Sequence, residues 1–284
     1  MPYSTLVSGA DLAQHLDDPV WVVVDCRHDL VAAGAGENAY NAAHIRDARF
    51  MHADRDLAGP LNGRNGRHPL PAAGVFMQTL GKAGITPSSQ VVTYDAQGGI
   101  FASRLWWMLH HWLGHRNVAV LDGGWNQWLA DARPQSTTVP RPAPSNYNAT
   151  PLDVIADTGY VQSHLGQAGM LLIDARAADR YRGENETLDP VAGHIPGARN
   201  RFFKDNLAAD GRFKSAAALR AEFETLIAGA TANTVVHQCG SGVTACHNKL
   251  AMDIAGLPGS RVYPGSWSEW CADPSRPVRT GPSP

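Results

Sequence analysis

Apolar runs without polar alternation recur along both halves of the chain, and they define its predicted elements. Runs of Val, Ile and Leu this short and continuous are typical of strands buried on both faces of a parallel sheet. They occupy residues 22–24, 91–92, 118–121, 171–173 and 235–236. Segments 101–113 and 217–227 instead carry apolar residues every three or four positions, which predicts helices. The alternation predicts an α/β fold, in which a parallel β-sheet is flanked by helices on both faces.

The pattern also repeats, because four anchor segments of the first half recur in the same order in the second half. Asp25 aligns with Asp174, Arg27 with Arg176, and His44 with His194. The paired segments are VVVDCRHDL and LLIDARAAD, AHIRDARF and GHIPGARN, VVTYDAQGG and VVHQCGSGV, and VAVLDGGWNQW and SRVYPGSWSEW. Residues that recur in both copies favour structural roles, and we interpret the Asp, Arg and His pairs in this way.

A stretch rich in Pro, Ser, Thr and Asn, residues 133–151, separates the two copies. This composition favours extended, solvated backbone over a packed element. We therefore predict an N-terminal domain over 1–136, a linker over 137–150 and a C-terminal domain over 151–284.

Composition narrows the class of function. The 284 residues carry a formal net charge of −2, so no strong field would attract a nucleic acid or an anionic membrane. Four cysteines are too few for a disulfide scaffold, and they favour a reducing compartment. The chain shows neither a leader pattern nor a membrane-spanning apolar run, so we expect a cytoplasmic protein.

The segment VVHQCGSGVTACHNKLAMDIAG predicts a buried strand, a glycine-containing loop that starts at Cys239, and a helix. Gly240 and Gly242 let the backbone curl, so that peptide N–H groups can converge on the sulfur of Cys239. With the positive end of the helix dipole, they favour anionic sulfur, and we expect a nucleophilic thiolate. The alternative is an inert buried cysteine. The matching loop of the first copy has Asp95 in this place, so chemistry is predicted only in the second domain.

These motifs resemble those of the tandem-domain rhodanese-like sulfurtransferases. The resemblance covers essentially the whole chain and rests on DARAADRYRG, GHIPGA, DGGWNQW, PGSWSEW and, above all, CGSGVTAC. It implies two parallel-sheet domains, of which only the second is active, and a loop cysteine that carries sulfur as a covalent persulfide without any cofactor. The loop Cys-Gly-Ser-Gly-Val-Thr is similar to that of the 3-mercaptopyruvate sulfurtransferases. Thiosulfate-preferring rhodaneses have Cys-Arg-Lys-Gly-Val-Thr, so 3-mercaptopyruvate is the predicted donor and thiosulfate the alternative.

The resemblance also implies roles for single residues. Cys239 matches the nucleophile, and the amide cradle around it spans Gly240, Ser241, Gly242, Val243 and Thr244. Arg180 matches the arginine that binds the substrate carboxylate, unless it only forms a surface ion pair. The compared enzymes carry a second arginine nine residues later, where this chain has Asp189. Arg182 or Arg104 could replace that contact.

Asp54 and His68 match an Asp and a His that the resemblance links to the loop serine, here Ser241. Such a chain would let Ser241 polarise the substrate carbonyl or relay a proton while Cys239 attacks sulfur. For His68, an exposed loop histidine is the competing interpretation.

Other functions remain as alternatives. A cysteine-dependent phosphatase would need an arginine six residues after the cysteine, where Ala245 stands. A sulfur carrier or docking module would form a persulfide on Cys239 without turning over small donors. The expected partners are a small-molecule sulfur donor and a thiol acceptor such as thioredoxin, or cyanide. No histidine or cysteine set has the paired spacing of a zinc site, so we predict no metal.

Overall fold

The chain folds into two compact units of the same kind, each built around a parallel sheet. The computed structural model describes residues 2–284. The first unit contains residues up to Gly59, Leu70–Asp153 and Ala209–Arg212. The second contains Pro60–Pro69, Val154–Ala208 and Phe213–Pro284. Each unit therefore includes a short segment from the other half of the chain, which the predicted boundaries did not anticipate.

The first unit has a five-stranded parallel sheet in the order β1-β6-β5-β2-β4. Its strands are β1 (Leu6–Val7), β2 (Trp21–Asp25), β4 (Arg49–Phe50), β5 (Gln90–Tyr94) and β6 (Val118–Leu121). A separate antiparallel pair joins β3 (His44–Ile45) to β7 (Gln135–Ser136). Residues 137–150 follow β7 without helix or strand, as their composition predicts, and pack with the first unit.

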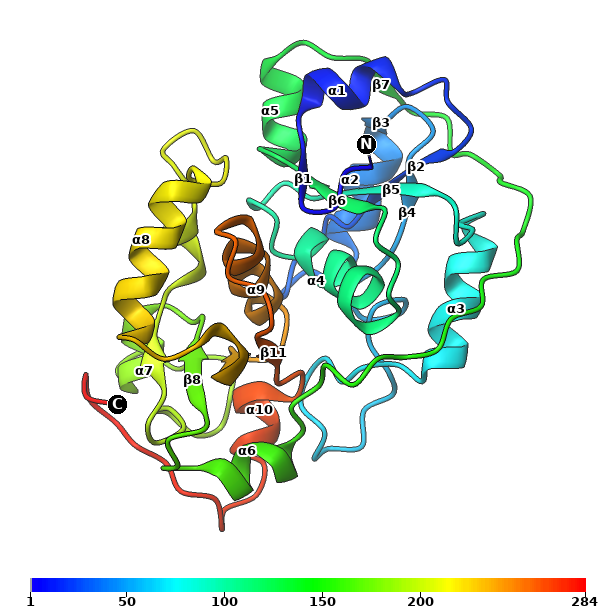
Figure 1. The fold of residues 1–284 in the computed structure, drawn as a ribbon. Helices are drawn as coiled ribbons and strands as arrows, with labels where there is room; N and C mark the ends of the chain where they lie inside the picture. The colour runs from blue at the N-terminus through cyan, green and yellow to red at the C-terminus, as the bar shows by residue number, and fades with distance from the viewer. Residues whose placement is uncertain (1) are drawn as a thin grey trace. The chain divides into compact units, whose positions relative to one another are not determined.

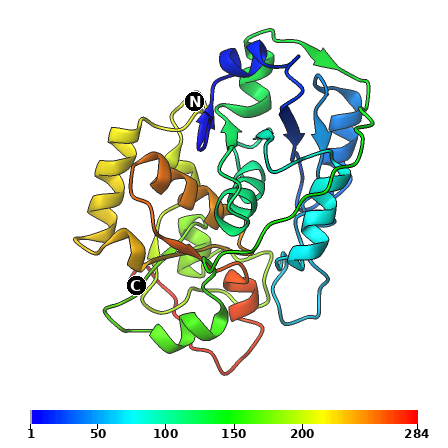
Figure 2. The same cartoon turned by 45° about the vertical axis from the view of Figure 1, so that its right-hand side comes forward.

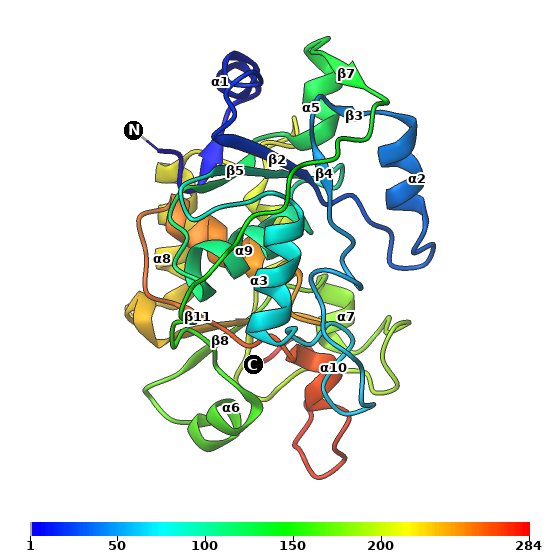
Figure 3. The same ribbon diagram turned by 90° about the vertical axis from the view of Figure 1, so that its right-hand side faces the viewer.

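Helices cover both faces of this sheet (Figures 1 and 3). One face packs against α1 (Gly9–Gln14), α2 (Ala35–Ala42) and α5 (Gly124–Ala130), which contribute the buried side chains of Leu12, Tyr40, Trp125 and Trp128. The other face carries α3 (Ala73–Lys82) and α4 (Ala102–Trp107), and α4 continues as the π-helix Met108–Trp112. The predicted helix over 101–113 is thus present, with its last turn widened.

The second unit repeats this arrangement with a four-stranded parallel sheet in the order β11-β10-β8-β9. Its strands are β8 (Leu171–Asp174), β9 (Arg199–Asn200), β10 (Val235–Gln238) and β11 (Arg261–Val262). One face packs against α6 (Thr158–His164), α7 (Ala178–Arg182) and α10 (Ser266–Trp270). On the other face α8 (Ala216–Ile227) and α9 (Thr244–Ile254) lie side by side (Figure 2). Two 3₁₀ turns, Phe203–Asn206 and Ala232–Thr234, complete the unit.

The residues that recur in both copies tie loops to strand ends. Arg27 pairs with Asp25 and donates to the carbonyl of Ala43 at 2.6 Å. Arg176 pairs with Asp174 in the same way and donates to the carbonyl of Gly193 at 2.7 Å. All four side chains are buried, which supports their structural interpretation.

The two recurring histidines are structural as well. His44 and His194 are fully buried, and both ring nitrogens of each lie within hydrogen-bond distance of backbone carbonyls.

The two parallel sheets with helices on both faces confirm the α/β fold predicted from the apolar runs. Among the described residues, no helix is long and apolar enough to cross a membrane.

Candidate functional site

The loop between β10 and α9 forms the centre of the candidate site. Cys239 directly follows β10, and α9 begins five residues later at Thr244. Gly242 has a φ of +78°, and a Cβ there would lie 2.2 Å from the carbonyl oxygen of Pro264. Only glycine fits this position, so the sharp curl of the loop is set by sequence. The N-terminal end of α10 holds the loop, because Trp267 and Ser268 donate backbone N–H bonds to the carbonyls of Cys239 and Gly240.

The curl brings a peptide donor to the sulfur of Cys239. The Gly242 N–H points at Sγ over 3.1 Å, and the Cys239 N–H donates to the hydroxyl of Ser266 at the same distance. Cys239 exposes only 2% of its surface. Cys246 is fully buried on α9, as predicted for a small core residue.

Ser241 and His68 form a direct pair within the second unit. Nδ1 of His68 lies 2.7 Å from Oγ of Ser241, and both residues are about 6% exposed. His68 belongs to the segment Pro60–Pro69 that joins this unit. The exposed-loop interpretation of His68 is therefore wrong. A buried imidazole bonded to a hydroxyl can hold that hydroxyl in a fixed orientation and exchange a proton with it.

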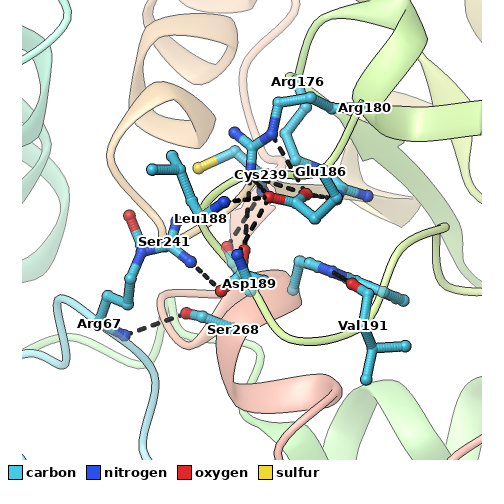
Figure 4. A network of polar contacts seen from close by, with 12 residues as sticks. Arg67, Arg176, Arg180, Glu186, Leu188, Asp189, Val191, Cys239, Ser241 and Ser268 are labelled. Atoms are coloured by element: carbon cyan, nitrogen blue, oxygen red, sulfur yellow. Dashed lines mark hydrogen bonds and ion pairs between the residues drawn. The ribbon is translucent and has the colours of Figure 1, made fainter. Parts of the chain in front are cut away.

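Arg180 is held by two acidic side chains rather than by a surface partner. Its Nε and Nη2 contact the carboxylate of Glu186 at 2.8–3.2 Å, and Nη2 also lies 3.4 Å from Oδ2 of Asp189. The side chains of Glu186 and Asp189 are 2% and 3% exposed. Figure 4 shows this cluster beside Cys239.

Arg67 is a residue of this site that sequence reasoning missed. Its Nη1 forms an ion pair with Oδ1 of Asp189, and its backbone N–H donates to Oγ of Ser268 at 3.0 Å (Figure 4). Burial, followed by the nearby Arg180 guanidinium, lowers the pKa of Arg67. The available signal was its position next to His68 in GRHPLP, but nothing local shows that this segment reaches Ser241, which is 173 positions from His68.

The remaining predicted residues lie elsewhere. Asp54 is in the first unit, where Oδ2 is 3.5 Å from Nε2 of His28, so its link to Ser241 stays a prediction. Arg182 pairs with Glu184 at the surface, and Arg104 donates to the carbonyl of Leu57 in the first unit. Both candidates for the missing second arginine therefore bind other groups.

Comparisons with known proteins agree with this architecture. The family model of the rhodanese-like domain matches residues 8–131 and 157–273. A probable 3-mercaptopyruvate sulfurtransferase of Pseudomonas aeruginosa is 44% identical over 99% of this chain and 100% of its own length. The thiosulfate sulfurtransferase of mouse is 34% identical over 99% of this chain and 97% of its own. Among solved structures, the 3-mercaptopyruvate sulfotransferase of Escherichia coli matches with a TM-score of 0.80 at 28% identity, over 94% of this chain and 100% of that one.

The fold and the site define a protein of two repeated α/β domains, with a cysteine in the strand-to-helix loop of the second. The family model matches each of the two domains as a rhodanese-like domain. The chain belongs to the family of tandem rhodanese-like sulfurtransferases and is an enzyme, as its motifs predicted.

Proposed function

We propose that this protein transfers sulfur from 3-mercaptopyruvate to a thiol or cyanide through a persulfide on Cys239. The observation that carries this proposal is the sulfur of Cys239, which accepts the Gly242 N–H in a tight loop beside Arg180. The loop has Gly240 and Ser241 where thiosulfate-preferring rhodaneses have two basic residues, and the Pseudomonas relative is named for the same donor.

In the first step the Cys239 thiolate attacks the thiol sulfur of the donor. A sulfur–sulfur bond forms, the carbon–sulfur bond of the donor breaks, and its electron pair leaves on carbon as the enolate of pyruvate. A proton delivered to that carbon gives pyruvate, and the hydrogen of the donor thiol stays on the persulfide. The hydroxyl of Ser241, held by His68 at 2.7 Å, is the candidate group for polarising the ketone and relaying the proton.

In the second step an acceptor anion attacks the outer sulfur of the persulfide. The sulfur–sulfur bond breaks, and its electron pair returns to Cys239 as the thiolate. A thiol such as that of thioredoxin would leave as a persulfide, and cyanide would leave as thiocyanate. The sulfur is carried covalently throughout, so we propose that the reaction uses no cofactor or resident metal. The four free cysteines support a reducing compartment, and we propose the cytoplasm.

The second candidate function is transfer from thiosulfate, since relatives such as the mouse enzyme are named for it. The test is a comparison of kcat/KM for the two donors with one acceptor, measured as pyruvate or sulfite release. Our proposal expects 3-mercaptopyruvate to be the better donor and Cys239→Ser to release no pyruvate beyond the rate without enzyme. A large preference for thiosulfate would overturn the choice of donor.

A further inference from the structure

Two guanidinium groups flank Gly240, the residue next to Cys239. A Cβ added to Gly240 would lie 2.9 Å from Nη2 of Arg67 and 3.5 Å from Nη2 of Arg180. The two arginines come from segments far apart in sequence, one from Pro60–Pro69 and one from α7. The absence of a side chain therefore leaves room for the guanidinium of Arg67 beside the catalytic loop, and the guanidinium of Arg180 lies at contact distance.

Asp189 connects the two arginines. Its Oδ1 pairs with Nη1 of Arg67, and its Oδ2 lies 3.4 Å from Nη2 of Arg180. Within the described part of the chain, the contacts of Arg67 use Nη1 and the backbone, and those of Arg180 use the backbone N–H, Nε and Nη2. Nη2 of Arg67 and Nη1 of Arg180 thus keep N–H donors at the side of Gly240, where a Cβ would be 3.6 Å from the latter.

We infer that Arg67 and Arg180 together bind the carboxylate of the sulfur donor, and that Asp189 is the positioning residue that orients Arg67 for this contact. The inference rests on the proposed function. It accounts for the acidic residue at position 189, because the second cation is supplied from the other side of the loop.

Charge decides which class of donor this site selects. Glu186 and Asp189 are buried against the two arginines, and Glu186 also contacts Arg176, which pairs with Asp174. The three cations and three anions of the cluster therefore sum to zero. Such a cluster attracts a dianion less than two unpaired arginines would, while its directed N–H groups still recognise one planar carboxylate. The site is therefore suited to a monoanionic 2-oxo acid that carries a thiol, and less suited to thiosulfate.

The first test measures Arg67→Ala with two donors, 3-mercaptopyruvate and mercaptoacetone, which has a methyl group in place of the carboxylate. The loss of a hydrogen bond to a charged group predicts that KM for 3-mercaptopyruvate rises by about 10- to 100-fold, with kcat little changed. KM for mercaptoacetone should stay unchanged. Arg67→Lys should recover part of the loss, and Arg64→Ala, in the same segment, should behave as the wild type.

An equal loss of activity with both donors would overturn the inference, because it would show that Arg67 only supports the fold around His68. So would an unchanged KM for 3-mercaptopyruvate. These results differ from a failure of the proposed function, in which the wild type itself would release no pyruvate from 3-mercaptopyruvate.

The second test uses Asp189→Asn, which keeps the volume of the side chain and removes its charge. Freed from its ion pair, Arg67 should bind the donor carboxylate less well, so KM for 3-mercaptopyruvate should rise. The cluster becomes net positive, so kcat/KM for thiosulfate relative to 3-mercaptopyruvate should increase. A fall in this ratio, or no change, would contradict the role assigned to Asp189.

Discussion

The two strand-to-helix loops of this protein have the same framework and begin with different acceptor side chains. In the first unit, the carboxylate of Asp95 accepts four backbone N–H groups, from Gln97, Gly99, Phe101 and Ala102, at 2.8–3.0 Å. In the second, Cys239 takes the place of Asp95, and its sulfur accepts the N–H of Gly242. The backbone carbonyls of both residues accept the backbone N–H of a tryptophan: Trp125 donates to Asp95, and Trp267 donates to Cys239.

This difference shows how one framework serves two purposes. A curled loop that presents peptide N–H groups stabilises whatever anion its first residue provides. A carboxylate fills the loop permanently and makes it structural, whereas a thiolate can form a bond to sulfur and release it again. We therefore interpret the first loop as the inactive counterpart of the second.

The most direct way to break the comparison is to give the second loop the residue of the first. Cys239→Asp should lower turnover of 3-mercaptopyruvate by on the order of 10³-fold or more, because no nucleophilic sulfur remains. The chain should stay folded, since a carboxylate can accept the N–H of Gly242. Pyruvate release and circular dichroism measure the two effects. Turnover near that of the wild type would show that Cys239 is not the nucleophile.

The second change removes the carboxylate of the first loop. Asp95→Ala leaves four buried N–H groups without their acceptor, and each such group costs about 1–3 kcal/mol, so the free energy of unfolding should fall by at least about 4 kcal/mol. Asp95→Asn keeps one acceptor oxygen and should cost less. Denaturant unfolding measures both variants, and an Asp95→Ala protein as stable as the wild type would contradict a structural role for Asp95.

A third change concerns a hydroxyl that is specific to the second loop. Ser241→Ala removes the partner of His68 and should lower kcat for 3-mercaptopyruvate by about 10²-fold if the hydroxyl relays a proton. Persulfide formation from thiosulfate involves no ketone, so it should be nearly unaffected. Equal losses with both donors would instead assign Ser241 to the structure of the loop.

The smallest expected effect is on the pH dependence of stability, and it concerns the strands that lead into the two loops. His237 in β10 aligns with Thr93 in β5, and full burial lowers the pKa of His237 to about 3. The folded protein keeps this ring neutral, whereas the unfolded chain binds a proton below the ordinary value of 6.5. Stability should therefore fall with decreasing pH between about 6.5 and 3, by about 2 kcal/mol at pH 5.

His237→Thr should remove this contribution. Urea titrations at pH 5 and pH 7 measure this effect. The variant should lose less stability on acidification than the wild type does. An identical loss in both proteins would show that His237 does not contribute to acid sensitivity.

Local sequence patterns could predict much of this fold. Apolar runs mark strands because burial on both faces of a sheet favours apolar side chains, and the repeat showed that one plan is used twice. The nucleophile was predictable too, because Cys239, Gly240 and Gly242 are adjacent in sequence and a glycine at positive φ is a local requirement.

What the sequence could not show depends on contacts between distant residues. Arg67 and Asp189 are 122 positions apart, and no periodicity indicates that Pro60–Pro69 packs with the second unit. The sequence shows that Asp189 stands where the compared enzymes have an arginine, but it does not show which residue pairs with Asp189. Arg182 and Arg104 were considered for the missing charge, whereas in the structure it is Arg67 that pairs with Asp189.

The central claim is that Cys239 carries sulfur, and the mass of the intact protein after incubation with 3-mercaptopyruvate tests it most directly. The account predicts that the wild type gains one sulfur atom, which a thiol reductant removes, and that Cys239→Ser gains none. An unchanged mass of the wild type, or an equal gain in the variant, would contradict it.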